Sequence, residues 1–121
     1  AVEALRDRVV ALQFGAYACM PCRRFTLDLA QIYNELKRDL RPFEIVYVSG
    51  DTTEDDFLKY FTRMPWLAVP FTNSALRQKL IEHFDIQDIP VVILFDENGR
   101  LINLSARRML AERGAAGYPY Y

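Results

Sequence analysis

Apolar residues fall into short runs rich in β-branched and aromatic side chains, separated by stretches in which they recur every three or four positions. The runs predict strands over residues 9–14, 43–49, 91–95 and 101–104. The helical spacing predicts helices over residues 22–41, 53–64, 74–84 and 105–113. The early strand–helix–strand unit implies parallel pairing, and the last two strands form a hairpin. We therefore expect an α/β fold, with a mixed central sheet and helices on both faces.

Residues near the ends of the predicted helices set their boundaries. Pro42 ends the first helix, because the residue before a proline is disfavoured in helical geometry. Thr53 is expected to cap the second helix and Ser105 the last one, with Gly114 just past its end. The third helix is expected to turn four apolar side chains toward the core: Leu76, Leu80, Ile81 and Phe84.

Composition narrows the class of protein. The 121 residues suffice for a single domain over 1–121, and 51% hydrophobic with 26% charged residues is typical of a soluble globular protein. A net charge of −1 gives no reason to expect nucleic acid or an anionic membrane as partner. No run approaches the roughly 18 apolar residues that span a bilayer. We expect a cytoplasmic monomer; a targeting signal before Ala1 would lie outside this sequence.

The two cysteines, Cys19 and Cys22, lie where the first predicted strand gives way to the first helix. A helix N-terminus has unpaired backbone N–H groups and a partial positive charge, both of which favour a thiolate. Arg23 and Arg24 add positive charge, so we expect a lowered pKa for Cys19. A thiolate there can attack a disulfide, and Cys22 can resolve the mixed disulfide. This pattern predicts a thiol–disulfide oxidoreductase.

Other uses of the two cysteines remain open. Zinc needs four ligands and the chain offers Cys19, Cys22 and His83, so a zinc or iron–sulfur site would have to be shared between two chains. A permanent structural disulfide between Cys19 and Cys22 would close a very short loop. It would therefore restrict the unfolded chain little and add little stability. Two unreactive buried thiols are a further alternative. We expect no metal site, and no cofactor besides the redox-active disulfide.

Several motifs resemble those of a known family. They are Cys19-Met20-Pro21-Cys22-Arg23 with Phe25-Thr26, Phe43-Glu44-Ile45-Val46, Tyr60-Phe61, the run from Met64 to Phe71, and Phe84 with Ile89-Pro90. From about Leu5 onward the chain resembles the tryparedoxin and nucleoredoxin branch of the thioredoxin-like superfamily, and its closing residues are more similar to tryparedoxin. The resemblance implies a thioredoxin fold in which the family's N-terminal strand or hairpin is short or missing.

The resemblance also implies a function and a set of site residues. Tryparedoxins take electrons from the dithiol trypanothione and pass them to target proteins such as peroxiredoxins; a reductase is another class of donor. Cys19 matches the attacking cysteine and Cys22 the resolving one. Pro90, after Ile89, matches the cis-proline that faces the dithiol. The alternative is a nucleoredoxin-like module, in which the redox state of the cysteines gates the binding of a protein partner.

Three positions depart from the family. Ala18 stands where the family has a tryptophan before the first cysteine. Gly50 and Thr52 stand where tryparedoxins have a tryptophan and an acid after the second strand. These side chains line the active-site surface in the family. The sequence therefore leaves the electron donor open.

The remaining candidate residues surround the dithiol. Met20 and Pro21 set the local shape between the cysteines, with Pro21 early in the helix, where its missing N–H costs nothing. Gln13 stands where thioredoxins carry a buried carboxylate, so proton transfer to the second cysteine must use water or another acid. Asp51 is a candidate for that acid, although a role as the cap of the next helix explains the residue equally well. Trp66 is expected to pack in the core rather than contact substrate.

Overall fold

The structure is a computed structural model that describes residues 2–121. Its strands are β1 (Val9–Gly15), β2 (Phe43–Ser49), β3 (Leu67–Ala68), β4 (Val91–Phe95) and β5 (Leu101–Asn103). Its α-helices are α1 (Met20–Arg38), α2 (Glu54–Phe61), α3 (Ser74–His83) and α4 (Arg107–Arg113). Two 3₁₀ helices are η1 (Val2–Leu5) and η2 (Gly114–Gly117). The predicted strands and helices are thus all present; β2 and β4 have the predicted bounds, and the other elements have one or both ends shifted.

The five strands form one mixed sheet in the order β3-β2-β1-β4-β5. β1 lies in the centre, parallel to β2 and antiparallel to β4, so that Ala11 has Ile45 on one side and Leu94 on the other. β4 and β5 form the predicted antiparallel hairpin. The edge strand β3, parallel to β2, was not predicted. Because β1 is central, the chain that leaves Gly15 enters α1 from the middle of the sheet.

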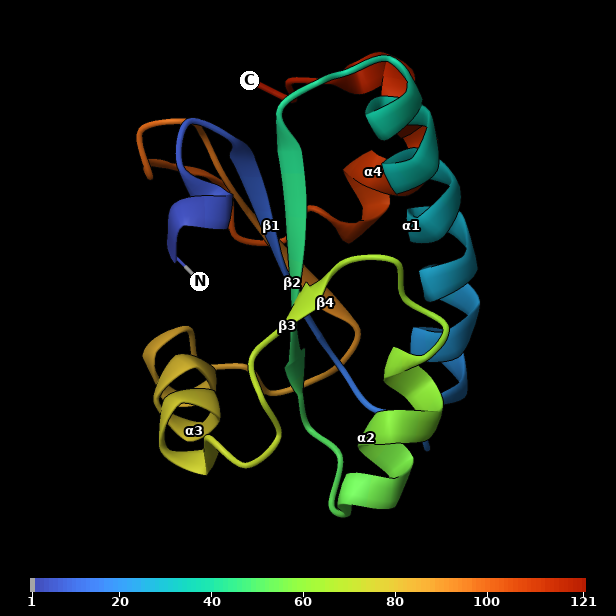
Figure 1. Ribbon diagram of the computed structural model, residues 1–121, viewed down its shortest axis with the longest axis vertical. Helices are drawn as coiled ribbons and strands as arrows, with labels where there is room; N and C mark the ends of the chain where they lie inside the picture. Colours follow the sequence, from blue (N-terminus) through green and yellow to red (C-terminus); the bar gives the residue numbers. More distant parts are fainter. Residues whose placement is uncertain (1) are drawn as a thin grey trace.

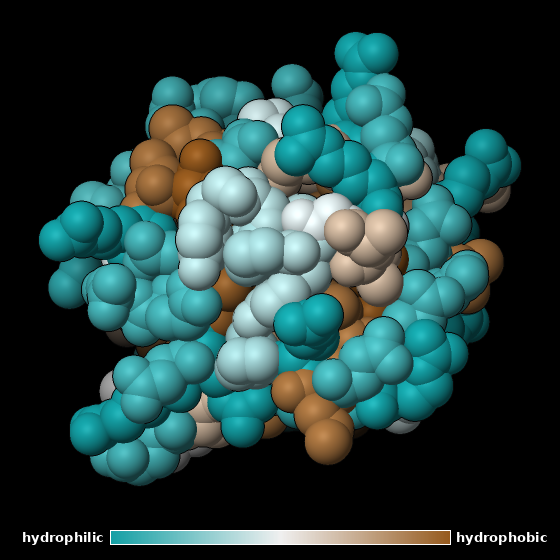
Figure 2. Space-filling view, turned by 90° about the horizontal axis from the view of Figure 1, so that it is seen from above, coloured by the Kyte–Doolittle hydropathy of each residue, from teal (hydrophilic) through white to brown (hydrophobic). Residues whose placement is uncertain are grey.

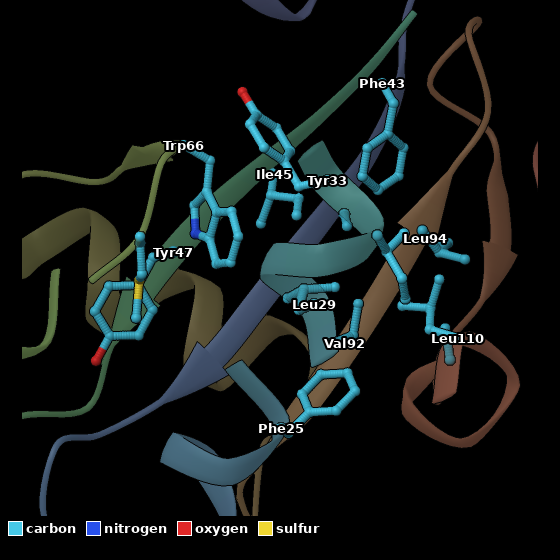
Figure 3. Packing of buried hydrophobic residues seen from close by; sticks show 14 of the residues in the cluster. Phe25, Leu29, Tyr33, Phe43, Ile45, Tyr47, Trp66, Val92, Leu94 and Leu110 are labelled. Carbon is cyan, nitrogen blue, oxygen red and sulfur yellow. The ribbon is translucent and has the colours of Figure 1, made fainter. Parts of the chain in front are cut away.

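Helices cover both faces of the sheet, as predicted. α1, α2 and α4 lie on one face, and α3 and η1 on the other (Figure 1). The larger core lies under α1, where Phe25 and Leu29 lie beside Val92 and Leu94 of β4 (Figure 3). The smaller core joins Phe14 and other sheet residues to α3. Burial of one such side chain contributes about 1.5–3 kcal/mol, so these two clusters hold the layers together.

The first helix ends earlier than Pro42 predicts. Its last residue is Arg38, and the chain then turns through Leu40, whose φ is 57° and whose side chain is 88% exposed. The amide of Arg41 donates to the carbonyl of Leu36, and that of Leu40 to Lys37. These two bonds form a Schellman motif, which satisfies the last carbonyls of the helix. The second helix likewise ends at Phe61, three residues before the predicted end.

Three other local predictions are tested by the structure. Thr53 caps α2, because its hydroxyl accepts from the amide of Asp56 at 3.2 Å. Ser105 does not cap α4: the N-cap is Ala106, whose amide donates to Val92 of β4, and this sheet contact places the helix start. Leu76 on α3 is 39% exposed, so its predicted place in the core is wrong, because the first turn of α3 extends beyond the sheet-facing cluster.

The outer surface is largely polar. At the end of the molecule away from the N-terminus of α1, hydrophilic residues cover most of the view, with apolar ones in small separate groups (Figure 2). Among residues 2–121, no helix combines the length and apolar character needed to cross a membrane. Gly114 follows α4 with φ of 59°, as predicted for a helix end.

Candidate redox site

The two cysteines lie at the N-terminus of α1, near the carboxyl end of the central strand. Cys19 is the N-cap, with φ of −86° and ψ of 107°, and its Sγ accepts a hydrogen bond from the amide of Cys22 at 3.2 Å. Met20 and Pro21 are the first two helical residues, so the proline removes an N–H that the helix leaves unpaired anyway. The cysteines thus lie at the strand-to-helix junction, as predicted, and the helix begins two residues earlier than predicted.

Cys19 and Cys22 are joined in a disulfide, with 5.2 Å between their Cα atoms. The two sulfurs differ in access, because Cys22 is 1% exposed while Cys19 is partly exposed. An incoming thiol therefore meets Cys19 first. This unequal exposure suits a pair in which Cys19 reacts with a partner while Cys22 stays covered.

The loop before β4 faces this pair. The Ile89–Pro90 peptide bond is cis, as the resemblance implies. The carbonyl oxygen of Ile89 lies 3.9 Å from the Sγ of Cys19, and Pro90 is buried. Pro90 immediately precedes β4, so its missing N–H removes no donor from the hydrogen bonds of the strand. Two segments about 70 residues apart in the sequence therefore meet at Cys19.

Gly15 allows the close approach of Cys22 to the sheet. A Cβ atom at this position would lie 3.4 Å from the Sγ of Cys22 and 3.8 Å from the ring of Tyr47. The Tyr47 hydroxyl donates to Oδ2 of Asp51 at 2.8 Å and lies 3.2 Å from the carbonyl of Gly15. Burial, with the nearby Asp51 carboxylate second, raises the pKa of Tyr47 well above its usual value. Tyr47 therefore stays protonated and serves as a donor beneath the dithiol.

Asp51 ties the dithiol loop to the end of β2. Its carboxylate accepts from the amide of Tyr17 at 2.6 Å, and from the hydroxyls of Tyr47 at 2.8 Å and Ser49 at 2.6 Å. The side chain is 7% exposed, and the cap of α2 is Thr53. The interpretation of Asp51 as a helix cap is therefore wrong. Its hydrogen bonds instead fix the loop that carries Cys19.

A second network of hydrogen-bonded side chains lies in the core behind the site. The Nε1 of Trp66 donates to Oε1 of Gln13 at 3.0 Å, and the Nε2 of Gln13 donates to the hydroxyl of Thr26 at 3.1 Å. Thr26 in turn shares a hydrogen bond with Tyr60. Trp66 is 5% exposed, as expected for core packing. Gln13 thus has hydrogen-bond partners on both its amide atoms.

Positive and aromatic side chains border the first turn of α1. The guanidinium of Arg23 lies 5.0 Å from the ring centroid of Tyr17, and that of Arg63 lies 5.5 Å from the same centroid. Arg23 could be identified from the sequence, whereas Tyr17 and Arg63 could not, since nothing in the local pattern places the end of α2 beside α1. Met20 is 63% exposed.

The positions that depart from the resembled family are exposed: Ala18, Gly50 and Thr52. The amide of Gly50 donates to the carbonyl of Gly15 at 2.8 Å, which places Gly50 beside the dithiol loop.

Within residues 2–121, no group of three His, Cys, Asp or Glu side chains is arranged to hold a metal ion. The arrangement offers one accessible sulfur, one buried sulfur, and a helix end with arginines around it. Such an arrangement is suited to thiol–disulfide exchange.

Known proteins share this arrangement. A family model described as thioredoxin-like matches residues 7–101. A probable nucleoredoxin 1 of Arabidopsis thaliana is 44% identical over 119 residues, covering 98% of this chain and 20% of that protein. The crystal structure of native tryparedoxin I from Crithidia fasciculata has a TM-score of 0.89 at 38% identity, covering 98% of this chain and 83% of that one. Tryparedoxin II complexed with glutathionylspermidine has a TM-score of 0.89 at 30% identity, covering 99% of this chain and 83% of that one.

The lengths of these relatives differ. The chain spans about a fifth of the plant nucleoredoxin and more than four fifths of the tryparedoxins. The five-stranded sheet, with helices on both faces and two cysteines at the start of α1, is the thioredoxin fold that the resemblance implied. The chain belongs to the thioredoxin-like family of oxidoreductases, in the branch that contains the tryparedoxins and nucleoredoxins.

Proposed function

We propose that this protein is a protein-disulfide reductase, which passes two electrons from a low-molecular-weight dithiol or a reductase to disulfides of target proteins. The observation that carries the proposal is the unequal exposure of Cys19 and Cys22 at the start of α1. Peroxiredoxins are the target class that the tryparedoxin resemblance suggests. We further propose that it works as a monomer in the cytoplasm, where thiols are kept reduced.

The reaction begins with the thiolate of Cys19, which the amide of Cys22 stabilises by a hydrogen bond. The thiolate attacks one sulfur of the target disulfide. That S–S bond breaks, a mixed disulfide forms, and the first target thiolate leaves and takes a proton from solvent. Cys22 then loses its proton and attacks the sulfur of Cys19, which releases the second target thiol. The target has gained two electrons and two protons, and the protein holds the Cys19–Cys22 disulfide.

Regeneration runs through the same exposed sulfur. A donor thiolate attacks Cys19, Cys22 leaves as a thiolate, and the second donor thiol resolves the mixed disulfide by forming the donor's own disulfide. The structure of tryparedoxin II complexed with glutathionylspermidine supports a low-molecular-weight thiol, rather than a reductase, as the donor. Stopped-flow reduction of the oxidised protein by trypanothione, by glutathione and by a thioredoxin reductase would identify the donor.

The central test is the reduction of insulin disulfides with dithiothreitol as donor. The protein is expected to catalyse it, and Cys19→Ser is expected to abolish turnover. Normal turnover by this variant would overturn the mechanism. Cys22→Ser retains the attacking sulfur but lacks the resolving one, so it is expected to accumulate mixed disulfides on Cys19.

The second candidate function is a redox-gated interaction module, favoured by the 44% identity to a nucleoredoxin. In that case turnover is incidental, and the oxidation state of the dithiol controls non-covalent binding. A pull-down with Cys22→Ser separates the two proposals. Covalently trapped peroxidases support the reductase, whereas non-covalent partners that bind one redox state support the module.

A further inference from the structure

A pocket of about 310 Å³ lies between the first turns of α1 and the end of α2. Three arginines line it: Arg23, Arg24 and Arg63. Two apolar side chains in its lining are strongly exposed, with Met20 63% and Leu27 71% accessible. The pocket therefore combines cationic walls with an apolar rim.

In the part of the chain that the structure describes, no acidic side chain shares this pocket with the three arginines, and Asp28 lines the adjoining pocket, together with Arg24. No Asp or Glu lines the pocket, and none of the three guanidiniums forms an ion pair within residues 2–121. The Nε of Arg23 is buried and has no hydrogen-bond partner. A net charge of −1 for the whole chain makes this a local surplus of positive charge.

Aromatic rings hold two of the arginines in place. Arg23 and Arg63 both lie near the ring of Tyr17, at 5.0 and 5.5 Å from its centroid. Tyr60 forms part of the pocket wall, and burial raises the pKa of its hydroxyl, an effect that its hydrogen bond to Thr26 opposes. Charges held by packing lose less side-chain entropy when they bind an anion.

The pocket adjoins the reactive sulfur along the chain. Met20 lines it and directly follows Cys19, and consecutive Cα atoms lie about 3.8 Å apart. An extended polypeptide whose cysteine is attacked by Cys19 advances roughly 3.3 Å per residue, so side chains a few residues away come within reach of the arginines. A carboxylate there would meet guanidinium groups suited to paired hydrogen bonds.

We propose that this arginine pocket is a subsite for an acidic side chain, located two to four residues from the disulfide cysteine of a target protein. The inference rests on the proposed reductase function and adds a preference among its targets. The apolar rim of Met20 and Leu27 fits a polypeptide with an apolar neighbour beside the acid. Charge complementarity then favours targets with a Glu or Asp near the attacked cysteine over neutral or basic ones.

The test uses three peptides that differ at one position, three residues from a single cysteine, with Glu, Gln or Lys there. Each cysteine carries the same uncharged small thiol as a mixed disulfide. Single-turnover reduction by the reduced protein is followed by stopped flow. We expect the Glu peptide to react about fivefold faster than the Gln peptide, as one moderately exposed ion pair can provide, and the Lys peptide more slowly than either. The advantage of Glu should shrink at high salt.

Variants assign the preference to the pocket. Arg63, just beyond the end of α2, lies outside the cysteine motif, and Arg63→Gln is expected to reduce the Glu-to-Gln rate ratio to about twofold or less. Arg100→Gln, an exposed arginine in the loop between β4 and β5, is the matched control and should retain the wild-type ratio. The fluorescence of Trp66, the one tryptophan of the chain, checks that each variant is folded.

The outcomes separate this inference from the function on which it rests. Equal rates for the Glu and Gln peptides, with both reduced, would overturn the subsite and leave the reductase function intact. An unchanged ratio in Arg63→Gln would also overturn it, because the preference would then arise elsewhere. Failure to reduce any of the three peptides would overturn the reductase function, and the subsite with it.

Discussion

The indole Nε1 of Trp66 donates a hydrogen bond to Oε1 of Gln13 at 3.0 Å, across 53 residues of sequence. Gln13 lies on the central strand β1, and its amide continues the contact to Thr26 on α1. One buried side chain thus links the segment that enters β3 to the helix that carries the dithiol.

Replacement of Trp66 by Phe should destabilise the protein by about 2–4 kcal/mol. The change removes part of a buried ring and leaves Oε1 of Gln13 without its donor, which alone costs about 1–3 kcal/mol. Urea unfolding followed by circular dichroism measures the loss. In a Gln13→Met background the cost of Trp66→Phe should be smaller by at least about 0.5 kcal/mol, since the coupling is gone. The same cost in both backgrounds would show that the hydrogen bond contributes nothing.

Asp51→Ala should loosen the loop that presents Cys19. The amide of Tyr17 and the hydroxyl of Ser49 would lose this acceptor, and the hydroxyl of Tyr47 would retain only the carbonyl of Gly15, so a cost of about 3 kcal/mol is expected. Urea unfolding measures it, and hydrogen exchange at the Tyr17 amide should become faster. Asp88→Ala at an exposed site is the control and should change stability by less than about 0.5 kcal/mol. Unchanged exchange at Tyr17 would contradict this role.

Stability should decline in alkaline solution. Burial raises the pKa of Tyr120 to about 12 and that of Tyr47 further. The unfolded chain releases these protons near pH 10, while the folded chain retains them. The stabilisation is therefore fully present below about pH 10 and is lost as pH rises toward the folded pKa values. Urea unfolding between pH 8 and 11.5, in roughly half-unit steps, should show this decline, and Tyr47→Phe should flatten it. A slope unaffected by Tyr47→Phe would exclude that residue as a source.

Gly117→Ala should destabilise the C-terminal segment for steric reasons. A Cβ atom there would lie 2.7 Å from the Cβ of Arg113 and 3.0 Å from the ring of Tyr120. Such overpacking costs about 1–3 kcal/mol. Ala116→Ser, at an exposed neighbour in the same 3₁₀ helix, should change stability by less than about 0.5 kcal/mol. Thermal unfolding compares the two, and equal midpoints would mean that the segment adjusts without cost.

Periodicity along the chain was enough to predict four strands, four α-helices and the junction at which the two cysteines lie. It missed β3, because a two-residue strand has no period, and its pairing with β2 is a tertiary contact. It also placed the end of α1 too late. The left-handed residue that ends this helix is Leu40, whereas the usual sequence signal at that position is glycine.

The same contrast between local pattern and tertiary contact applies to the candidate site. The dithiol and its helix could be predicted because a single local stretch encodes them. The cap interpretation of Asp51 was wrong, since its position before α2 suits a cap, while its hydrogen-bond partners come from the dithiol loop and β2. The proximity of Arg63 to Arg23 depends on how α2 packs against α1, which no local pattern encodes.

The order of the strands has a consequence for how the molecule behaves among its own copies. Both outer strands are short, with two residues in β3 and three in β5, while the longer strands have neighbours on both sides. A sheet with such edges offers few unpaired amides and carbonyls for a second sheet to extend. Edge-to-edge association of two such sheets is thereby disfavoured.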